Sequence, residues 1–225
     1  MDAALLALKE VAKSFPSPGK SLIILESVSL EVRGTQTLAI SGPSGSGKST
    51  LLGLMAALER PDSGEIFFRG QSMRGWDEDA LAAWRSASVG FIFQNFGLIP
   101  SLTALENVSL PLEILGWGLR AAAKRAAEIL DELGLNGRHD HFPSQLSGGE
   151  QQRVAIGRAY AHSPALILAD EPTGSLDRDT AEKVLGTLLN INSAKKTALV
   201  VVTHDDDIAS RMGRRLLLNQ GRIVP

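Results

Sequence analysis

The sequence predicts an α/β fold in which a largely parallel sheet carries a small antiparallel β part and an inserted helical part. Three observations lead to this fold class. A glycine-rich segment joins a short apolar run to a helix-period stretch at residues 37–52, TLAISGPSGSGKSTLL. Further apolar runs end in polar residues, as the buried strands of parallel sheets do. The periodicity from about residue 101 to 161 is helical throughout.

The glycine-rich segment has the spacing G-x-x-x-x-G-K-S between a strand and a helix, which is the context of a phosphate-binding loop. Gly42, Gly45 and Gly47 can adopt positive φ, so successive backbone N–H groups can turn inward to form a concave anion site. The positive end of the helix dipole closes that site. Lys48 would reach the β- and γ-phosphates of a nucleotide, and the Ser49 hydroxyl a magnesium ion. A plain glycine-rich turn is the alternative, and it does not require this combination.

Size and composition exclude several classes of protein. A chain of 225 residues is long enough for one buried core with a lobe inserted into it. The net charge of −2 without basic runs argues against a nucleic-acid partner. The chain has no cysteine, which excludes disulfides and thiolate chemistry. The apolar runs are too short to cross a bilayer. We therefore expect a soluble, cytoplasmic protein without direct lipid insertion.

Residues 5–11 and 27–32 alternate apolar and polar side chains, as half-buried strands do. Residues 14–19 (SFPSPG) between them are typical of a turn or loop. These strands are expected to pair antiparallel beside the phosphate loop. Phe15 could pack on the edge of the core or offer a flat face to a base, and its residue type alone favours packing.

The middle of the chain alternates helices and apolar strands. Asp77 can cap a helix that runs to about Arg85, and the strand at 89–93 (VGFIF) ends at Gln94. A polar residue at the carboxyl end of a buried strand is where an α/β sheet places its ligand contacts. A satisfied strand terminus is an equal alternative for Gln94.

The helical block contains two capping boxes. Thr103 and Glu106 form the first, and Pro111 is expected to interrupt or kink the helix that follows. Ser147 and Glu150 form the second, at the start of an amphipathic helix. A capping box does not explain two adjacent glycines between them, Gly148 and Gly149, because each costs a helix about 1 kcal/mol relative to alanine. Glycines there allow an anion to approach the first-turn N–H groups, so we favour a second phosphate-facing site.

Two more apolar strands end in ionisable residues that could take part in catalysis or metal binding. Residues 165–169 (ALILA) lead to Asp170 and Glu171, and residues 197–203 lead to His204. Two carboxylates at the end of a buried strand cost free energy of desolvation unless a cation binds them. With a phosphate loop in the same chain, magnesium is the natural cation.

The remaining segments complete the prediction. Residues 174–177 read as a turn into a helix through about Ile191, and 214–218 with 222–224 read as a hairpin. The spacing of the other histidines, His139, His141 and His162, suggests no metal site, and we interpret them as surface residues.

Taken together, these segments resemble the ATPase subunits of ABC transporters over essentially the full chain. The resemblance consists of six motifs in the family's order: the phosphate loop 42–49, the Gln94 loop, LSGGEQQR at 146–153, ILADE ending at Glu171, Ser175-Leu176-Asp177, and His204. Residues 95–100, 106–108 and 169–174 are similar to the branch that contains MacB, LolD, FtsE and YbbA. Residues 138–145 (RHDHFPSQ) look most like YbbA.

The resemblance implies a RecA-like P-loop NTPase core with an antiparallel β subdomain, formed by residues 1–95 and 162–225. Residues 96–161 would form the helical signature subdomain of this single ATP-binding domain. Two copies would form a homodimer in the ATP-bound state, head to tail. Each nucleotide would lie between the phosphate loop of one copy and the signature of the other.

The resemblance also implies the site residues. ATP and Mg²⁺ would be the cofactors, with Glu171, His204, Lys48 and Gln94 as the catalytic residues. Ser49 and Gln94 would bind the metal directly and Asp170 through water. The nucleotide-binding residues would be Phe15 (stacked on adenine), Gly42, Pro43, Ser44, Gly45, Ser46, Gly47, Lys48, Ser49, Thr50, Gln94, Ser147, Gly148, Gly149, Glu150, Asp170, Asp177 and His204.

The implied partner is an integral membrane permease, which would contact residues 96–102 and hold the chain peripherally on the inner membrane. The branch serves export, lipoprotein release or mechanotransmission. The main alternative is a soluble ABC ATPase acting on nucleic acid or ribosomes, but those relatives carry coiled-coil insertions or two fused cassettes. A P-loop kinase or GTPase would need neither LSGGEQQR nor His204, and the N-K-x-D element of GTPases is not found.

Overall fold

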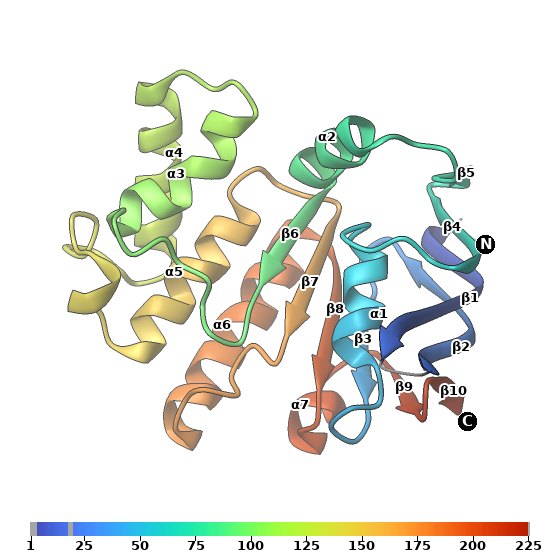
Figure 1. Cartoon of the computed structure of the whole chain (residues 1–225). Coiled ribbons are helices and arrows are strands. Elements are labelled where there is room, and N and C mark those ends of the chain that lie inside the picture. The colour runs from blue at the N-terminus through green and yellow to red at the C-terminus, as the bar shows by residue number, and fades with distance from the viewer. Residues whose placement is uncertain (1–3, 18–19, 225) are drawn as a thin grey trace. The chain divides into compact units, whose positions relative to one another are not determined.

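The computed structural model describes residues 4–17 and 20–224, which fall into two compact units (Figure 1). Unit 1 combines residues 1–85 and 198–225, and unit 2 holds residues 86–197. Helix α2 (Glu78–Ser88) runs across the boundary. The expected division into residues 1–95 with 162–225 and residues 96–161 stays a prediction.

Unit 1 is mostly β structure. Its elements are β1 (Ala4–Ser17), β2 (Lys20–Arg33), β3 (Thr37–Ser41), α1 (Lys48–Met55), β4 (Ser63–Phe68), β5 (Gln71–Ser72), β8 (Ala198–Thr203), α7 (Asp206–Ser210), β9 (Arg214–Asn219) and β10 (Arg222–Val224). One sheet has the order β2-β1-β4-β5 and is antiparallel, as predicted for the amino-terminal strands. Asp77 caps α2 as expected, since its Oδ1 accepts a hydrogen bond from the Ala80 N–H at 2.8 Å.

The turn between the first two strands is shorter than the sequence indicates. Residues 14–17 were expected in a loop, but they extend β1, and Phe15 pairs with Leu22 and Ser17 with Lys20. Pairing with β2 satisfies the backbone groups of this segment, which outweighs its Pro- and Ser-rich composition. The rest of the expected turn, Pro18 and Gly19, lies outside the described residues.

The parallel strands of unit 1 position the phosphate loop. Strand β3 pairs parallel with β8 on one side and β9 on the other, and β10 closes the predicted hairpin with β9. The β3 side chains Leu38, Ala39 and Ile40 are fully buried. Because Ser41 lies opposite Thr203, the residues that follow these two strands leave at the same edge.

Unit 2 contains two parallel strands and the helical block. Its elements are β6 (Val89–Ile92), α3 (Ala104–Ile114), α4 (Leu119–Glu132), the 3₁₀ turn η1 (Pro143–Gln145), α5 (Gly148–Tyr160), β7 (Leu166–Asp170) and α6 (Arg178–Lys195). Strand β6 pairs parallel with β7. Helix α5 lies so close to β6 that a Cβ on Gly90 would be 2.2 Å from the Ala159 carbonyl oxygen. Only glycine fits that position.

Two expectations about unit 2 are revised. Pro111 does not interrupt its helix, because α3 continues to Ile114 with Val108 and Leu112 fully buried on either side of the proline, and of the two expected effects only a kink stays a prediction. His162 is not a surface residue, because both ring nitrogens are buried. Burial also lowers the pKa of this imidazole. Within residues 4–17 and 20–224, no helix has the length and apolar character needed to span a bilayer.

Candidate nucleotide site

The phosphate loop lies between β3 and α1 in unit 1, and its glycines adopt the predicted conformation. Gly42, Gly45 and Gly47 have φ values of 153°, 79° and 99°. A Cβ on Gly42 would lie 2.1 Å from the Leu218 carbonyl oxygen, and one on Gly47 would lie 2.9 Å from that of Ile24. Both backbone conformation and close packing therefore require glycine at these two positions.

Lys48 and Ser46 carry the signs of an anion site. Lys48 is 8% exposed, and its Nζ donates to the carbonyl oxygens of Gly42 at 2.8 Å and Pro43 at 3.0 Å. The Ser46 hydroxyl is buried and has no hydrogen-bond partner among the described residues. A buried ammonium held only by backbone carbonyls and an unsatisfied hydroxyl both gain a strong acceptor when a phosphate enters the loop. The loop therefore fits a nucleotide.

Two further predicted residues lie close to this loop in unit 1. Ser49 is exposed in the first turn of α1, beside the positive end of its dipole. His204 follows β8 and is exposed at the edge where β3 leads into the loop. The structure thus brings the loop and His204 to one edge of the same unit.

Phe15 is not part of the core, contrary to the interpretation from residue type. Its side chain is 37% exposed on β1, and the Lys13 ammonium lies 5.2 Å from the ring centroid. That ammonium is in turn held by the Arg60 carbonyl oxygen at 2.7 Å and by Glu59 at 3.2 Å. An exposed phenyl ring is compatible with stacking on a base, which the resemblance implies.

The polar residues of unit 2 also converge at one edge. Because Ile92 of β6 lies opposite Ala169 of β7, Gln94 and the Asp170–Glu171 pair leave their strands together. The Ser175 hydroxyl donates to the Gln94 carbonyl oxygen at 3.0 Å. Glu171 has a φ of 46°, in the left-handed region that non-glycine residues seldom adopt. Strained backbone of this kind gathers at functional sites.

The Gln94 loop is braced by two residues that the sequence analysis did not single out. The Arg158 guanidinium donates to the carbonyl oxygens of Phe96, at 3.1 Å, and Gly97. Burial lowers the pKa of this guanidinium. The Asn107 side chain is fully buried and bonds both the N–H and the carbonyl of Ile99, at 2.8 and 3.2 Å. No sequence pattern distinguishes this arginine from a solvated one on an amphipathic helix.

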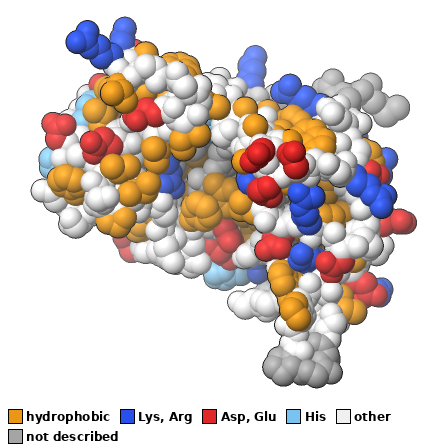
Figure 2. Space-filling model, turned by 45° about the horizontal axis from the view of Figure 1, so that its top comes forward, with side chains coloured by type: hydrophobic (Ala, Val, Ile, Leu, Met, Phe, Trp, Pro, Cys, Tyr) orange, Lys and Arg blue, Asp and Glu red, His pale blue; other side chains and the backbone are white. Residues whose placement is uncertain are grey.

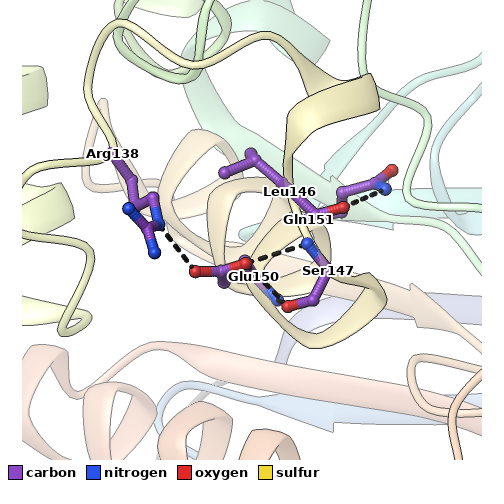
Figure 3. A network of polar contacts seen from close by, with 5 residues as sticks. All are labelled: Arg138, Leu146, Ser147, Glu150 and Gln151. Atoms are coloured by element: carbon purple, nitrogen blue, oxygen red, sulfur yellow. Dashed lines mark hydrogen bonds and ion pairs between the residues drawn. The ribbon is translucent and has the colours of Figure 1, made fainter.

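The signature segment starts α5 with the predicted capping box (Figure 3). The Ser147 hydroxyl accepts from the Glu150 N–H at 3.3 Å and donates to Glu150 Oε2 at 2.7 Å. Glu150 Oε1 accepts from Arg138 Nε at 3.0 Å. Hydrogen bonds from the Ser147 hydroxyl and N–H, and then from Arg138, lower the pKa of Glu150 to about 2. Glu150 is therefore an anion throughout the physiological pH range.

Packing gives a second reason for the paired glycines. A Cβ on Gly149 would lie 2.5 Å from Thr180 Cγ2 on α6, and one on Gly148 would lie 3.1 Å from Leu176 Cδ2. Gly149 is also buried. Close approach between α5 and α6 thus explains Gly149, while Gly148 is the more accessible of the two.

Asp177 and Gln152 have structural partners as well. The Asp177 carboxylate caps α6 by accepting from the Thr180 N–H at 3.0 Å. The buried Gln152 amide donates to the Pro172 carbonyl oxygen. The signature helix is therefore tied to the segment that follows Glu171. In the described ranges, 4–17 and 20–224, no group of three or more His, Cys, Asp or Glu residues could hold a metal.

The loop between β3 and α1 and the parallel strands around it define a nucleoside-triphosphate-binding protein of the P-loop class. Comparison with known proteins refines this class. The family description "ABC transporter" matches residues 25–174. The chain is 46% identical to the lipoprotein-releasing system ATP-binding protein LolD of Geobacter metallireducens, covering 99% of each chain. It is 45% identical to the uncharacterized ABC transporter ATP-binding protein YbbA of Escherichia coli, covering 97% of this chain and 96% of YbbA.

A solved structure agrees with these relatives. The dimeric post-hydrolysis state of the ATP-binding cassette MJ0796, bound to ADP and Pi, matches with a TM-score of 0.89 and 40% identity, over 98% of this chain and 97% of that one. The chain belongs to the ABC transporter family. It is an ATP-binding and ATP-hydrolysing cassette, which confirms the resemblance and the fold class. LolD and YbbA, two members of the branch that the sequence resembles, match at similar identity.

Proposed function

We propose that this cassette powers a separate integral membrane permease through an ATP-driven cycle of homodimer closure and opening. The proposal rests chiefly on the phosphate loop, where Lys48 and the unsatisfied Ser46 hydroxyl can donate hydrogen bonds to an anion. Similarity over nearly the whole length to LolD, named as a subunit of a lipoprotein-releasing system, supports the coupling to transport. The permease would hold the cassette peripherally on the inner membrane.

Family membership supports nucleotide-related roles for residues in each unit. In unit 1, the loop residues 42–50 would bind the phosphates, Phe15 would stack on adenine, and His204 would steady the γ-phosphate. In unit 2, Glu171 would position or deprotonate the attacking water. Hydroxyl and carbonyl or amide oxygens suit Mg²⁺, so Ser49 and Gln94 would bind the ion and Asp170 would act through water. The ion neutralises charge on the phosphates when bound.

The signature segment would serve the nucleotide of a second copy. Ser147 and the first-turn N–H groups of α5 form a helix N-terminus, where the dipole favours an anion. Triphosphate bound to one copy would then join both copies, and loss of the γ-phosphate would release them. The dimeric form of MJ0796, which is 40% identical, supports this arrangement.

Two exposed apolar surfaces of unit 2 are suited to the permease. The first is the Gln94 loop, where Phe93 and Ile99 are exposed. The second is the turn between α3 and α4, where Ile114, Trp117 and Leu119 are 65%, 46% and 72% exposed. Figure 2 shows hydrophobic side chains over the helical part of unit 2, at the left of the view. Exposed apolar side chains grouped on one segment support, for each surface, a contact with a protein partner.

The variant Glu171→Gln tests the proposed cycle. It keeps the size and polarity of the side chain but removes the carboxylate that would handle the water, so hydrolysis should fall by at least about 100-fold while ATP still binds. The dimer should then accumulate in the presence of ATP. Light scattering measures the dimer, and a phosphate-release assay measures hydrolysis. Glu128→Gln, an exposed residue on α4, is the matched control and should behave as the unchanged protein. Full turnover in the Glu171 variant would remove the assigned role.

Recovery of the partner tests the coupling to transport. The tagged cassette, purified from membranes of its native host in mild detergent, should carry an integral membrane protein whose sequence identifies the permease. Recovery with ribosomes or nucleic acid instead would favour the soluble alternative.

A further inference from the structure

The carboxylate of Glu150 lies between the signature serine and a cation. Arg138, on the loop before η1, donates from Nε to Glu150 Oε1 at 3.0 Å (Figure 3). The other oxygen, Oε2, accepts from the Ser147 N–H at 2.8 Å and from the Ser147 hydroxyl at 2.7 Å. Arg138 therefore touches the signature serine only through Glu150.

The ion pair adds little to the fold itself. The capping box that starts α5 is complete without Arg138, because Ser147 and Glu150 satisfy each other's backbone N–H groups. The Arg138 side chain is 46% exposed, and exposed ion pairs contribute little to stability. A glutamine at position 150 would satisfy the same capping box but would carry no charge. The dipole of α5 favours a negative charge in its first turn, but it does not explain the arginine beside that charge.

A negative charge at Glu150 conflicts with the function proposed for its neighbour. If Ser147 receives a triphosphate held by a second copy, the Glu150 carboxylate lies close to that anion. Two like charges repel more strongly once dimer closure excludes water from between them. Because hydrogen bonds from Ser147 and Arg138 keep the pKa of Glu150 at about 2, protonation cannot remove this charge near neutral pH. A cation bound to this carboxylate would reduce the repulsion.

The Ser147 hydroxyl adds a competition for one proton. A serine hydroxyl has a single O–H donor, and here it points to Glu150 Oε2. A phosphate oxygen of the partner's nucleotide would require the same donor. Because Arg138 binds Oε1 and withdraws charge from the carboxylate, it makes Oε2 a weaker competitor for that hydroxyl.

We propose that Arg138 is a positioning residue for dimer closure: it neutralises and holds the Glu150 carboxylate so that Ser147 can turn its hydroxyl to the partner's triphosphate. This inference rests on the proposed dimer. Arg138 itself does not contact the nucleotide, because it acts through Glu150. Its effect should therefore depend on the charge at position 150.

A double-mutant cycle between positions 138 and 150 tests the inference. The proteins are the unchanged chain, Arg138→Ala, Glu150→Gln and the double variant, each with Mg²⁺ and a non-hydrolysable ATP analogue. Light scattering gives the analogue concentration at which half of the protein is dimeric. Fluorescence of a labelled nucleotide gives the affinity of the monomer, and thermal unfolding reports the fold.

Arg138→Ala should raise the half-dimer concentration by about tenfold or more, because each closed dimer contains two uncompensated carboxylates. The affinity of the monomer and the unfolding midpoint should stay nearly unchanged. Glu150→Gln sets its own reference value for the half-dimer concentration, and adding Arg138→Ala to it should change that value by less than about twofold. Arg138→Lys should fall between arginine and alanine, because it retains the charge but not the guanidinium geometry.

Three results would overturn the inference. An equal loss from Arg138→Ala in the otherwise unchanged chain and in the Glu150→Gln variant would show a purely structural role. Equal dimerisation of Arg138→Ala and the unchanged chain would show no role, while the proposed function would stand. An unchanged chain that stays monomeric at saturating analogue would overturn the proposed dimer as well, so the two failures are distinguishable.

Discussion

His162 shows at the residue scale how burial controls a titration. Because burial disfavours the imidazolium, the folded-state pKa of His162 lies below the ordinary value of 6.5. The unfolded chain therefore takes up a proton more readily as the pH falls through 6.5, and the free energy of unfolding should fall with it. Below about pH 6.5 the slope for this group has an upper limit of about 1.4 kcal/mol per pH unit, which corresponds to a difference of one proton between the two states.

Urea unfolding across that range measures the slope, and His162→Gln provides the comparison. The variant has no group that titrates at position 162, so its unfolding free energy should vary less with pH, whatever its absolute stability. Parallel pH profiles for both proteins would show that His162 is already accessible to protons in the folded state.

The residue scale also shows what sequence reasoning could and could not find. The capping boxes at Thr103 and Ser147 were predicted correctly because each depends on residues three positions apart. The burial of His162 and the exposure of Phe15 were not, because both depend on segments distant in the chain. The same holds for the packing of Gly149 against Thr180, which local helix energetics could not reveal.

At the scale of elements, the positions of strand ends followed from apolar patterning, while the bracing of loops did not. Gln94 and His204 were predicted at strand ends, and β6 and β8 do end before them. The hydrogen bonds from Arg158 to the Gln94 loop were not predicted. The sequence of an amphipathic helix does not show whether an arginine side chain is buried against a loop or exposed to solvent. Its partners Phe96 and Gly97 lie about sixty residues earlier.

Arg158→Ala should loosen the Gln94 loop. It removes two charge-assisted hydrogen bonds, so the carbonyl oxygens of Phe96 and Gly97 lose their partner, at a cost of about 1–3 kcal/mol. The Ile99 N–H, which bonds Asn107, should exchange faster with deuterium than in the unchanged chain. Arg158→Lys should lie between the two, because lysine cannot present the planar fork. Equal Ile99 exchange in all three proteins would show that Asn107 alone holds the loop.

At the scale of the whole molecule, the decisive question is whether two copies share a triphosphate. The proposed function assigns the phosphate loop of unit 1 to the nucleotide of its own copy and the N-terminus of α5 in unit 2 to the nucleotide of a second copy. A head-to-tail pair would place a loop opposite an α5 terminus twice, so the interface closes on itself and produces a dimer rather than a filament.

Ser147→Arg would place a bulky side chain at the α5 terminus and should abolish ATP-dependent dimerisation, while binding of nucleotide to the loop of the monomer should be retained. Arginine also removes the helix cap, so the control is Ser147→Gly, since glycine at this position costs only a few tenths of a kcal/mol. The glycine variant lacks the hydroxyl but leaves the space open, and it should still dimerise at higher ATP concentration. Light scattering that shows the same ATP-dependent dimer in Ser147→Arg as in the unchanged chain would mean that α5 does not face the triphosphate, and the shared site would have to be abandoned.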